Sequence, residues 1–205
     1  MRPFAIAITL AAAAACPVLA ISARAEDVTE PRSGTAFAAH SGDMTLLGVG
    51  LRTKTFLKVK VYAIGLYVSD EAFSGPLAAH KGKTGTPAFY ADLAAGDFAK
   101  QVTLKFLRDV TTDQIRGAFR EVLTGADKAR TEAFVGYFSE TKSGQEYVIR
   151  WTPSVGLETT VAGQPRAPIN DPAFAKAVFA IWLGEKPIQE DLKKAIVSRA
   201  GELIR

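Results

Sequence analysis

Arg52 is unusual in this sequence because it is a charged residue in an apolar, strand-like setting. It directly follows the run Gly48-Val49-Gly50-Leu51, and Tyr62 lies in the next apolar segment. A guanidinium binds a carboxylate through two parallel hydrogen bonds, and a phenol can add a third. If Arg52 faces the interior, it must be paired or bind an anion, to which Tyr62 could add its hydroxyl, because an unpaired buried charge is costly. The alternative, which the pattern by itself favours, is that Arg52 ends a strand at the surface and Tyr62 fills the core.

The chain of 205 residues offers little other material for catalysis or metal binding. Its single cysteine excludes a cysteine-built zinc or iron–sulfur site, and two histidines, His40 and His80, leave little for a histidine-rich one. Both histidines lie in loop-like or helix-end contexts, which predict solvated surface positions. The sequence has no Walker motif and no dinucleotide-binding glycine motif. We therefore expect no metal, no cofactor and no catalytic residue.

The composition is that of an ordinary folded protein, with 48% hydrophobic and 22% charged residues. The length is typical of one domain with a sizeable core. The formal net charge of +4 is small and the basic residues are scattered, so we do not expect nucleic-acid binding.

The first 25 residues have the three parts of a secretory signal peptide. Arg2 supplies the positive charge, Phe4 to Ala20 form an alanine-rich apolar run, and Ala23 and Ala25 fit the small-residue cleavage site. We predict cleavage after Ala25 and export to a periplasm. A membrane anchor fits less well, because a span needs roughly 20 strongly apolar residues. A lipoprotein signal at Cys16 is the other alternative.

Cleavage would leave a mature chain without a thiol, which suits an oxidising compartment. No stable membrane insertion is then expected. Residues 26–34 are polar and are predicted to form a loose leader before the folded domain, residues 35–205.

Residues 35–69 have the alternating pattern of antiparallel strands, and the glycines near Arg52 indicate a bulge or a close backbone approach. Further strands are predicted at 100–106, 147–152 and 155–161, the last two as a hairpin. Helices are expected at 71–80, after a capping box from Thr111 to Gln114, at 128–138, after Asn170 or Asp171, and from Pro187 onward. The predicted class is α+β, an antiparallel sheet covered by helices on one side.

Three segments, in order, resemble the chalcone isomerase-like family. They are the paired strands 48–54 and 60–68, the hairpin 151–157, and the closing helix 174–187. The likeness covers most of residues 35–205. It implies an open-faced β-sandwich in which a ligand cleft lies between a large sheet and a helical layer.

In the plant enzymes of that family, a chalcone cyclises to a flavanone, and an arginine, a threonine, a tyrosine and an asparagine surround the reacting groups. The resemblance places the arginine at Arg52 and the threonine at Tyr62. It places the tyrosine near Ile115 and the asparagine near Val122. Three of the four polar groups are therefore changed in this chain.

An arginine with a tyrosine resembles instead the non-catalytic family members that bind fatty acids. The resemblance thus implies that Arg52 and Tyr62 hold the carboxylate of a small apolar ligand such as a fatty acid. One alternative is an isomerase or intramolecular lyase on an unknown substrate, with Arg52 stabilising an oxyanion and Tyr62 donating a proton. Another is haem binding through His40, His80, a tyrosine or a methionine.

Overall fold

The computed structural model describes residues 27–54 and 57–204, so the predicted signal peptide, residues 1–25, lies outside the described residues. A seven-stranded antiparallel sheet in the order β3-β4-β5-β6-β7-β8-β9 forms its centre. The strands are β3 (His40–Ser41), β4 (Met44–Lys54), β5 (Val59–Ser69), β6 (Lys100–Phe106), β7 (Glu146–Thr152), β8 (Gly156–Val161) and β9 (Gln164–Pro165).

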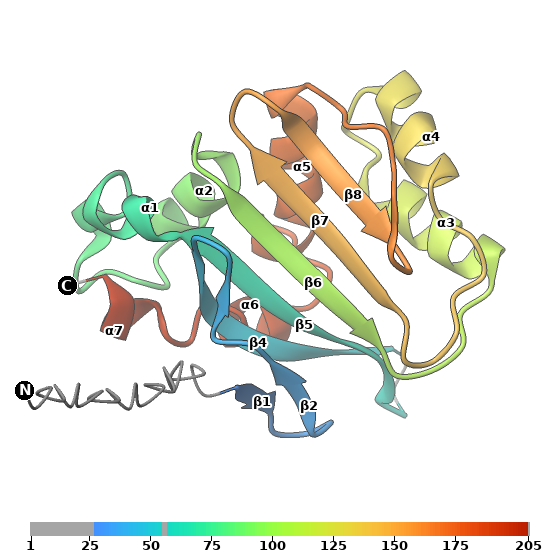
Figure 1. Ribbon diagram of the computed structural model, residues 1–205, viewed down its shortest axis with the longest axis horizontal. Coiled ribbons are helices and arrows are strands. Elements are labelled where there is room, and N and C mark those ends of the chain that lie inside the picture. Colours follow the sequence, from blue (N-terminus) through green and yellow to red (C-terminus); the bar gives the residue numbers. More distant parts are fainter. Residues whose placement is uncertain (1–26, 55–56, 205) are drawn as a thin grey trace, which may run out of the picture.

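The helices cover one face of this sheet (Figure 1), which confirms the predicted open-faced α+β architecture. They are α1 (Asp70–Ser74), the 3-10 turn η1 (Ala78–His80), α2 (Pro87–Ala95), α3 (Thr112–Val122), α4 (Lys128–Gly136), α5 (Pro172–Leu183), α6 (Glu190–Ala195) and α7 (Ala200–Leu203). A separate hairpin of β1 (Val28–Glu30) and β2 (Thr35–Phe37) lies beside β4.

The pairing of β4 with β5 brings Arg52 opposite Tyr62. A register shift between Leu46 and Gly48 changes which side chains of β4 face the helices. Leu46 packs on the outer face, whereas Gly50, beyond the shift, contacts α6. Because side chains alternate along a strand, Arg52 then faces the helices as Gly50 does.

The two glycines before Arg52 allow the C-terminal segment to lie directly on β4. A Cβ atom on Gly48 would lie 2.5 Å from the Ala195 carbonyl oxygen, and one on Gly50 would lie 2.6 Å from Leu192 Cδ1. Both distances are shorter than van der Waals contact. At Gly48 the obstacle is backbone, so only glycine fits there, whereas at Gly50 the nearest atom is the end of the Leu192 side chain. The predicted close backbone approach is confirmed.

Helix boundaries that have a capping signal in the sequence occur where predicted. The Thr111 hydroxyl accepts from the Gln114 amide, and the Gln114 side chain accepts from the Thr111 amide. The Asp171 carboxylate accepts from the amides of Ala173 and Phe174, with Pro172 in the first turn. Because both caps are local, they position α3 and α5 against the sheet without long-range help.

Several expectations were wrong. The segment 87–95 was not recognised as a helix, yet it forms α2 with Thr86 as N-cap. The final helix is divided into α6 and α7 by the residues that lie against β4. The loose leader expected at 26–34 contains β1, because the buried Glu30 carboxylate accepts from Ser33 N at 2.8 Å and Ser33 Oγ at 2.6 Å.

Within residues 27–54 and 57–204, no helix is long and apolar enough to span a membrane. In the same ranges, no three or more His, Cys, Asp or Glu side chains gather in a way that could hold a metal ion.

Candidate functional site

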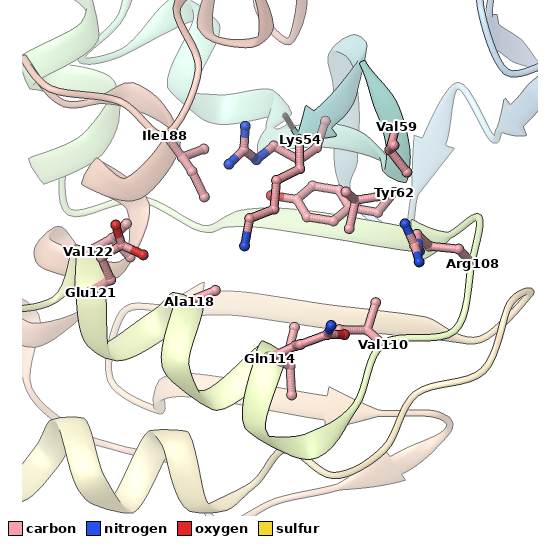
Figure 2. Close-up of a pocket in the computed structure, with 13 residues that line it drawn as sticks. Lys54, Val59, Tyr62, Arg108, Val110, Gln114, Ala118, Glu121, Val122 and Ile188 are labelled. Carbon is pink, nitrogen blue, oxygen red and sulfur yellow. The ribbon is translucent and has the colours of Figure 1, made fainter. Parts of the chain in front are cut away.

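A cavity of about 550 Å³ lies between the β4–β5 pair and helix α3. Figure 2 shows Lys54, Val59 and Tyr62 from the strands on one side, and Gln114, Ala118 and Glu121 from α3 on the other. Its size falls in the usual range for small-molecule sites, about 300–1,000 Å³. Arg52 and Tyr62 both line it, so the structure brings the two predicted ligand-binding residues together.

The Arg52 guanidinium is anchored on one side and free on the other. Nη1 donates to the Thr53 carbonyl at 2.7 Å and to Gln189 Oε1 at 3.1 Å. Those two bonds use both protons of Nη1. Among the described residues, no acceptor is bonded to Nε or Nη2, and these two nitrogens form the edge that can grip a carboxylate in two places.

The Tyr62 hydroxyl is held by a buried partner from α5. Trp182 Nε1 donates to it at 3.1 Å. Burial raises the pKa of Tyr62, although the bond from Trp182 and the charge of Arg52 lower it in part. The phenol therefore keeps its proton at neutral pH, and no described residue accepts that proton. Tyr62 can donate one hydrogen bond into the cavity.

The rest of the cavity wall is mostly apolar. Ile115 and Val122, the positions expected to align with the family's tyrosine and asparagine, both line it, as do Val59, Val61, Val110 and Ile188. A hydroxyl and an amide are thus absent where the resemblance places them. The apolar part of the wall suits a hydrocarbon chain, and Lys54, Arg108, Gln114 and Glu121 make the remaining lining polar.

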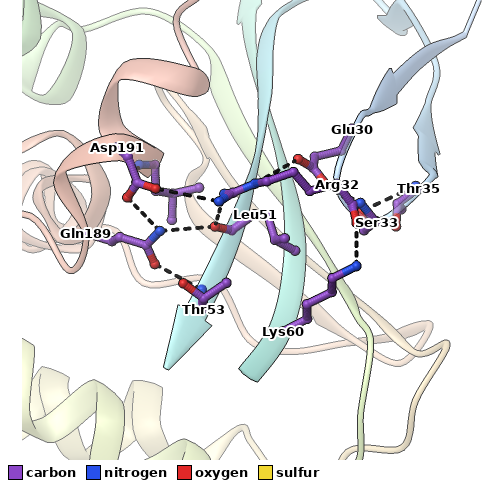
Figure 3. Close-up of polar contacts among 10 residues, drawn as sticks. Glu30, Arg32, Ser33, Thr35, Leu51, Thr53, Lys60, Gln189 and Asp191 are labelled. Atoms are coloured by element: carbon purple, nitrogen blue, oxygen red, sulfur yellow. Dashed lines mark hydrogen bonds and ion pairs between the residues drawn. The ribbon is translucent and has the colours of Figure 1, made fainter. Parts of the chain in front are cut away.

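Gln189 fixes Arg52 and connects it to the N-terminal hairpin. Its Oε1 also accepts from Thr53 N at 3.0 Å, and its Nε2 donates to the Leu51 carbonyl at 3.2 Å and to Asp191 at 2.7 Å. Arg32 of the hairpin lies 3.8 Å from the Asp191 carboxylate (Figure 3). The network thus links the Arg52 guanidinium to the segment before α6 and, through Asp191, to the β1–β2 hairpin.

Another cation, Lys100, is buried and lies away from this cavity at the C-terminal end of α2. Its Nζ donates to the carbonyls of Leu93 at 3.0 Å, Ala94 at 2.9 Å and Gly96 at 2.8 Å. Burial lowers the pKa of Lys100 to about 7, while Asp97 acts in the opposite direction. A smaller cavity of about 250 Å³ adjoins it, but all three ammonium protons are already used.

Neither histidine lines either of these two cavities. His40 is exposed as predicted and its Nδ1 is 3.1 Å from the Thr45 hydroxyl. The surface position predicted for His80 is wrong, since it is 8% exposed, stacked edge-on to Phe89 and 2.8 Å from the Asp92 carboxylate. Both rings are engaged in local contacts.

Comparison with known sequences identifies the family. The profile of a family described as chalcone isomerase-like matches residues 25–198, most of the chain. This chain belongs to the chalcone isomerase-like family.

Chalcone isomerase-like relatives include both binding proteins and enzymes. Fatty-acid-binding protein 1 of Arabidopsis thaliana is 26% identical over 87% of this chain and 72% of its own length. Chalcone–flavanone isomerase 1A of Glycine max is 27% identical over 84% of this chain and 87% of its own length.

The fold of this family member matches a crystal structure of an Arabidopsis thaliana fatty-acid binding protein, AtFAP1. The TM-score is 0.75 at 20% identity, with 87% of this chain and 99% of that chain covered. The match confirms the chalcone isomerase-like fold.

Two residues that hold the site were not recognised as such in the sequence. Trp182 lies in the expected closing helix 174–187 but was given no role of its own, and Gln189 was not singled out. A buried tryptophan needs a hydrogen-bond acceptor for its indole N–H. This requirement was the one signal in the sequence that Trp182 has a polar partner. No local pattern pointed to Gln189.

Proposed function

We propose that this chalcone isomerase-like protein binds a small apolar carboxylate, such as a fatty acid, in the cavity between β4–β5 and α3, and does not catalyse a reaction. The observation that carries the proposal is that two sets of hydrogen-bond donors lie together without a protein acceptor in the described part of the chain. They are Nε and Nη2 of Arg52 and the hydroxyl of Tyr62. Both groups line one apolar cavity.

The headgroup would bind through three hydrogen bonds. Nε and Nη2 of Arg52 would each donate to one carboxylate oxygen, and the Tyr62 hydroxyl would donate a third bond. Charge-assisted bonds of this kind contribute about 1.5–3 kcal/mol each. Trp182 and Gln189 hold the two donors in place before the ligand arrives, which reduces the entropy cost of binding.

The hydrocarbon tail would lie along the apolar wall formed by Val59, Ile115 and Val122. Each buried methylene contributes about 0.8 kcal/mol, so most of the affinity comes from the tail. The charged end then fixes the direction in which the tail enters.

The alternative, an isomerase or intramolecular lyase, would need polar groups to polarise a ketone and move a proton. The wall opposite Tyr62 carries Ile115 and Val122 where the resemblance places a tyrosine and an asparagine, although Gln114 and Glu121 of the same helix also line the cavity. This is why we propose binding rather than catalysis.

The decisive experiment is a titration of delipidated protein with a fluorescent fatty acid. We expect Arg52→Ala to weaken binding about 100-fold, since it removes two charge-assisted bonds. Arg150→Ala is the matched control, because Arg150 also lies on a strand of the sheet but pairs with Gln101, on the face away from the cavity. Its affinity should equal that of the wild type.

Equal affinity of wild type and Arg52→Ala would overturn the proposed site. Mass spectrometry of the ligand that copurifies with wild-type protein would identify it. Turnover of a hydroxychalcone by the wild type, lost in Arg52→Ala, would establish the isomerase instead.

We also propose that the protein is exported and that residues 1–25 are removed. The support is the charge, apolar run and small-residue end of that segment. Expressed in a bacterium with a secretion pathway, the protein should appear in the periplasmic fraction with the intact mass of residues 26–205. Retention of the first 25 residues would contradict this.

A further inference from the structure

An exposed leucine lies at the tip of the hairpin that forms one wall of the cavity. Leu57 is 70% exposed and lies two residues before Val59, which lines the cavity. Val122, 37% exposed, lines the cavity from α3. A third exposed apolar residue, Val155 at 44%, lies at the β7–β8 turn, the opposite end of the strands. Leu57 is thus the most exposed of these three side chains, and it lies at the end of the sheet that carries the cavity.

Exposed cations surround this leucine. Lys54 and Lys58 flank it on the hairpin, and Arg108 follows Leu107, whose amide donates to the Val61 carbonyl at 2.9 Å. None of the three cations is within ion-pair distance of a carboxylate among residues 27–54 and 57–204. We call Lys54, Leu57, Lys58 and Arg108 the hairpin rim.

The nearby acids neutralise the hairpin rim only in part, since the charge of Asp109 interacts with both Arg108 and Lys142. Asp109 lies 3.3 Å from the Lys142 ammonium and accepts from Ser143 N at 2.9 Å. Glu121 is the acidic residue that lines the cavity, and it lies on α3 (Figure 2). The rim therefore presents a net positive charge around an apolar side chain.

We propose that the hairpin rim docks on an anionic lipid surface, and that the cavity exchanges its ligand directly with that membrane. The proposal rests on the binding function above. Lysine and arginine are attracted to anionic headgroups, and an exposed leucine gains free energy when it enters the acyl boundary. A poorly soluble apolar carboxylate could then move between bilayer and cavity without crossing water.

Cosedimentation with vesicles tests the docking. Wild-type protein should bind phosphatidylcholine vesicles that contain about a quarter phosphatidylglycerol, and bind pure phosphatidylcholine vesicles weakly. Leu57→Asp should weaken binding about tenfold, and Lys58→Glu about fivefold or more. Val155→Asp is the matched control, with the same kind of change at the other end of the sheet, and should bind as wild type does.

The same variants separate this proposal from the binding function. Leu57 and Lys58 do not line the cavity, so both variants should keep the wild-type affinity for a fluorescent fatty acid in solution. The transfer of that probe from vesicles to protein should slow in parallel with the loss of docking. Absence of vesicle binding by the wild type, or an equal loss in Val155→Asp, would overturn the docking surface even if the fatty acid binds in solution.

Discussion

Two cations lie under the helical layer of this protein, and their surroundings differ in one decisive respect. Lys100 has three protons and three carbonyl acceptors, with the rings of Phe98 and Phe179 at 4.8 and 5.3 Å. Arg52 has two of its five protons bonded, and the others have no acceptor among the described residues.

The difference separates a cation whose donors all have protein acceptors from one that keeps donors without a protein acceptor in the part of the chain that the structure describes. Lys100 closes the C-terminal end of α2, where a positive charge meets the negative end of the helix dipole. Arg52 is instead held by Gln189 with its second edge free, beside a cavity of about 550 Å³. Lys100 is buried with every donor bonded to the protein, whereas Arg52 is partly buried and keeps donors beside the cavity, which is the basis of its proposed binding role.

Removing the Lys100 side chain should lower the stability of the fold without changing the affinity for a fatty acid. Lys100→Ala leaves three carbonyls without a donor and opens a void, so we expect the free energy of unfolding to fall by about 3 kcal/mol. Urea denaturation measures this change. In the absence of urea, the folded variant should bind a fatty acid with the wild-type affinity. A loss of affinity in the folded variant would mean that the two cations act on the same site.

The pH dependence of stability should sharpen the same contrast. Because the folded-state pKa of Lys100 is lowered from 10.5 to about 7, the unfolded chain binds more protons between these values. Stability from this group therefore rises with pH across that window, by about 2 kcal/mol from pH 7 to 9. Urea melts of the wild type and of Lys100→Met, compared at each pH, isolate the contribution. Parallel profiles for the two proteins would contradict it.

A smaller change tests the proposed binding role of Tyr62. Trp182→Phe removes the donor that orients the Tyr62 hydroxyl, so we expect fatty-acid affinity to fall about fivefold. In a Tyr62→Phe background the same substitution should have no further effect on affinity. A similar loss in both backgrounds would show that Trp182 acts through packing alone, and the fluorescence titration distinguishes these results.

Much of the fold could be predicted because its signals are local. The alternating pattern of 100–106 and the capping box at Thr111 gave β6 and the start of α3 within a residue. Helix α2 was missed, since a stretch rich in glycine and lysine drew attention to the loop before it, although Thr86 and Pro87 form a helix start. The buried Glu30 could not be foreseen, because its burial depends on the turn that it closes.

The site was predictable only in part, because some of its contacts join residues that are far apart in the sequence. Arg52 and Tyr62 lie on adjacent strands, so their pairing follows from a short-range pattern. Trp182 reaches Tyr62 from 120 residues away, and Gln189 reaches Arg52 from 137. Such contacts arise from packing α5 and the segment before α6 onto the sheet, and no spacing in the sequence reports them.

The two glycines of β4 also limit how this protein can diversify. Any side chain at Gly48 would displace the backbone at Ala195 and Ile196, and α6, with Gln189 at its start, would move with them. A substitution outside the cavity can therefore displace the residue that anchors Arg52. A library designed to retune the cavity for other ligands should keep both glycines and vary Val59, Ile115 and Val122.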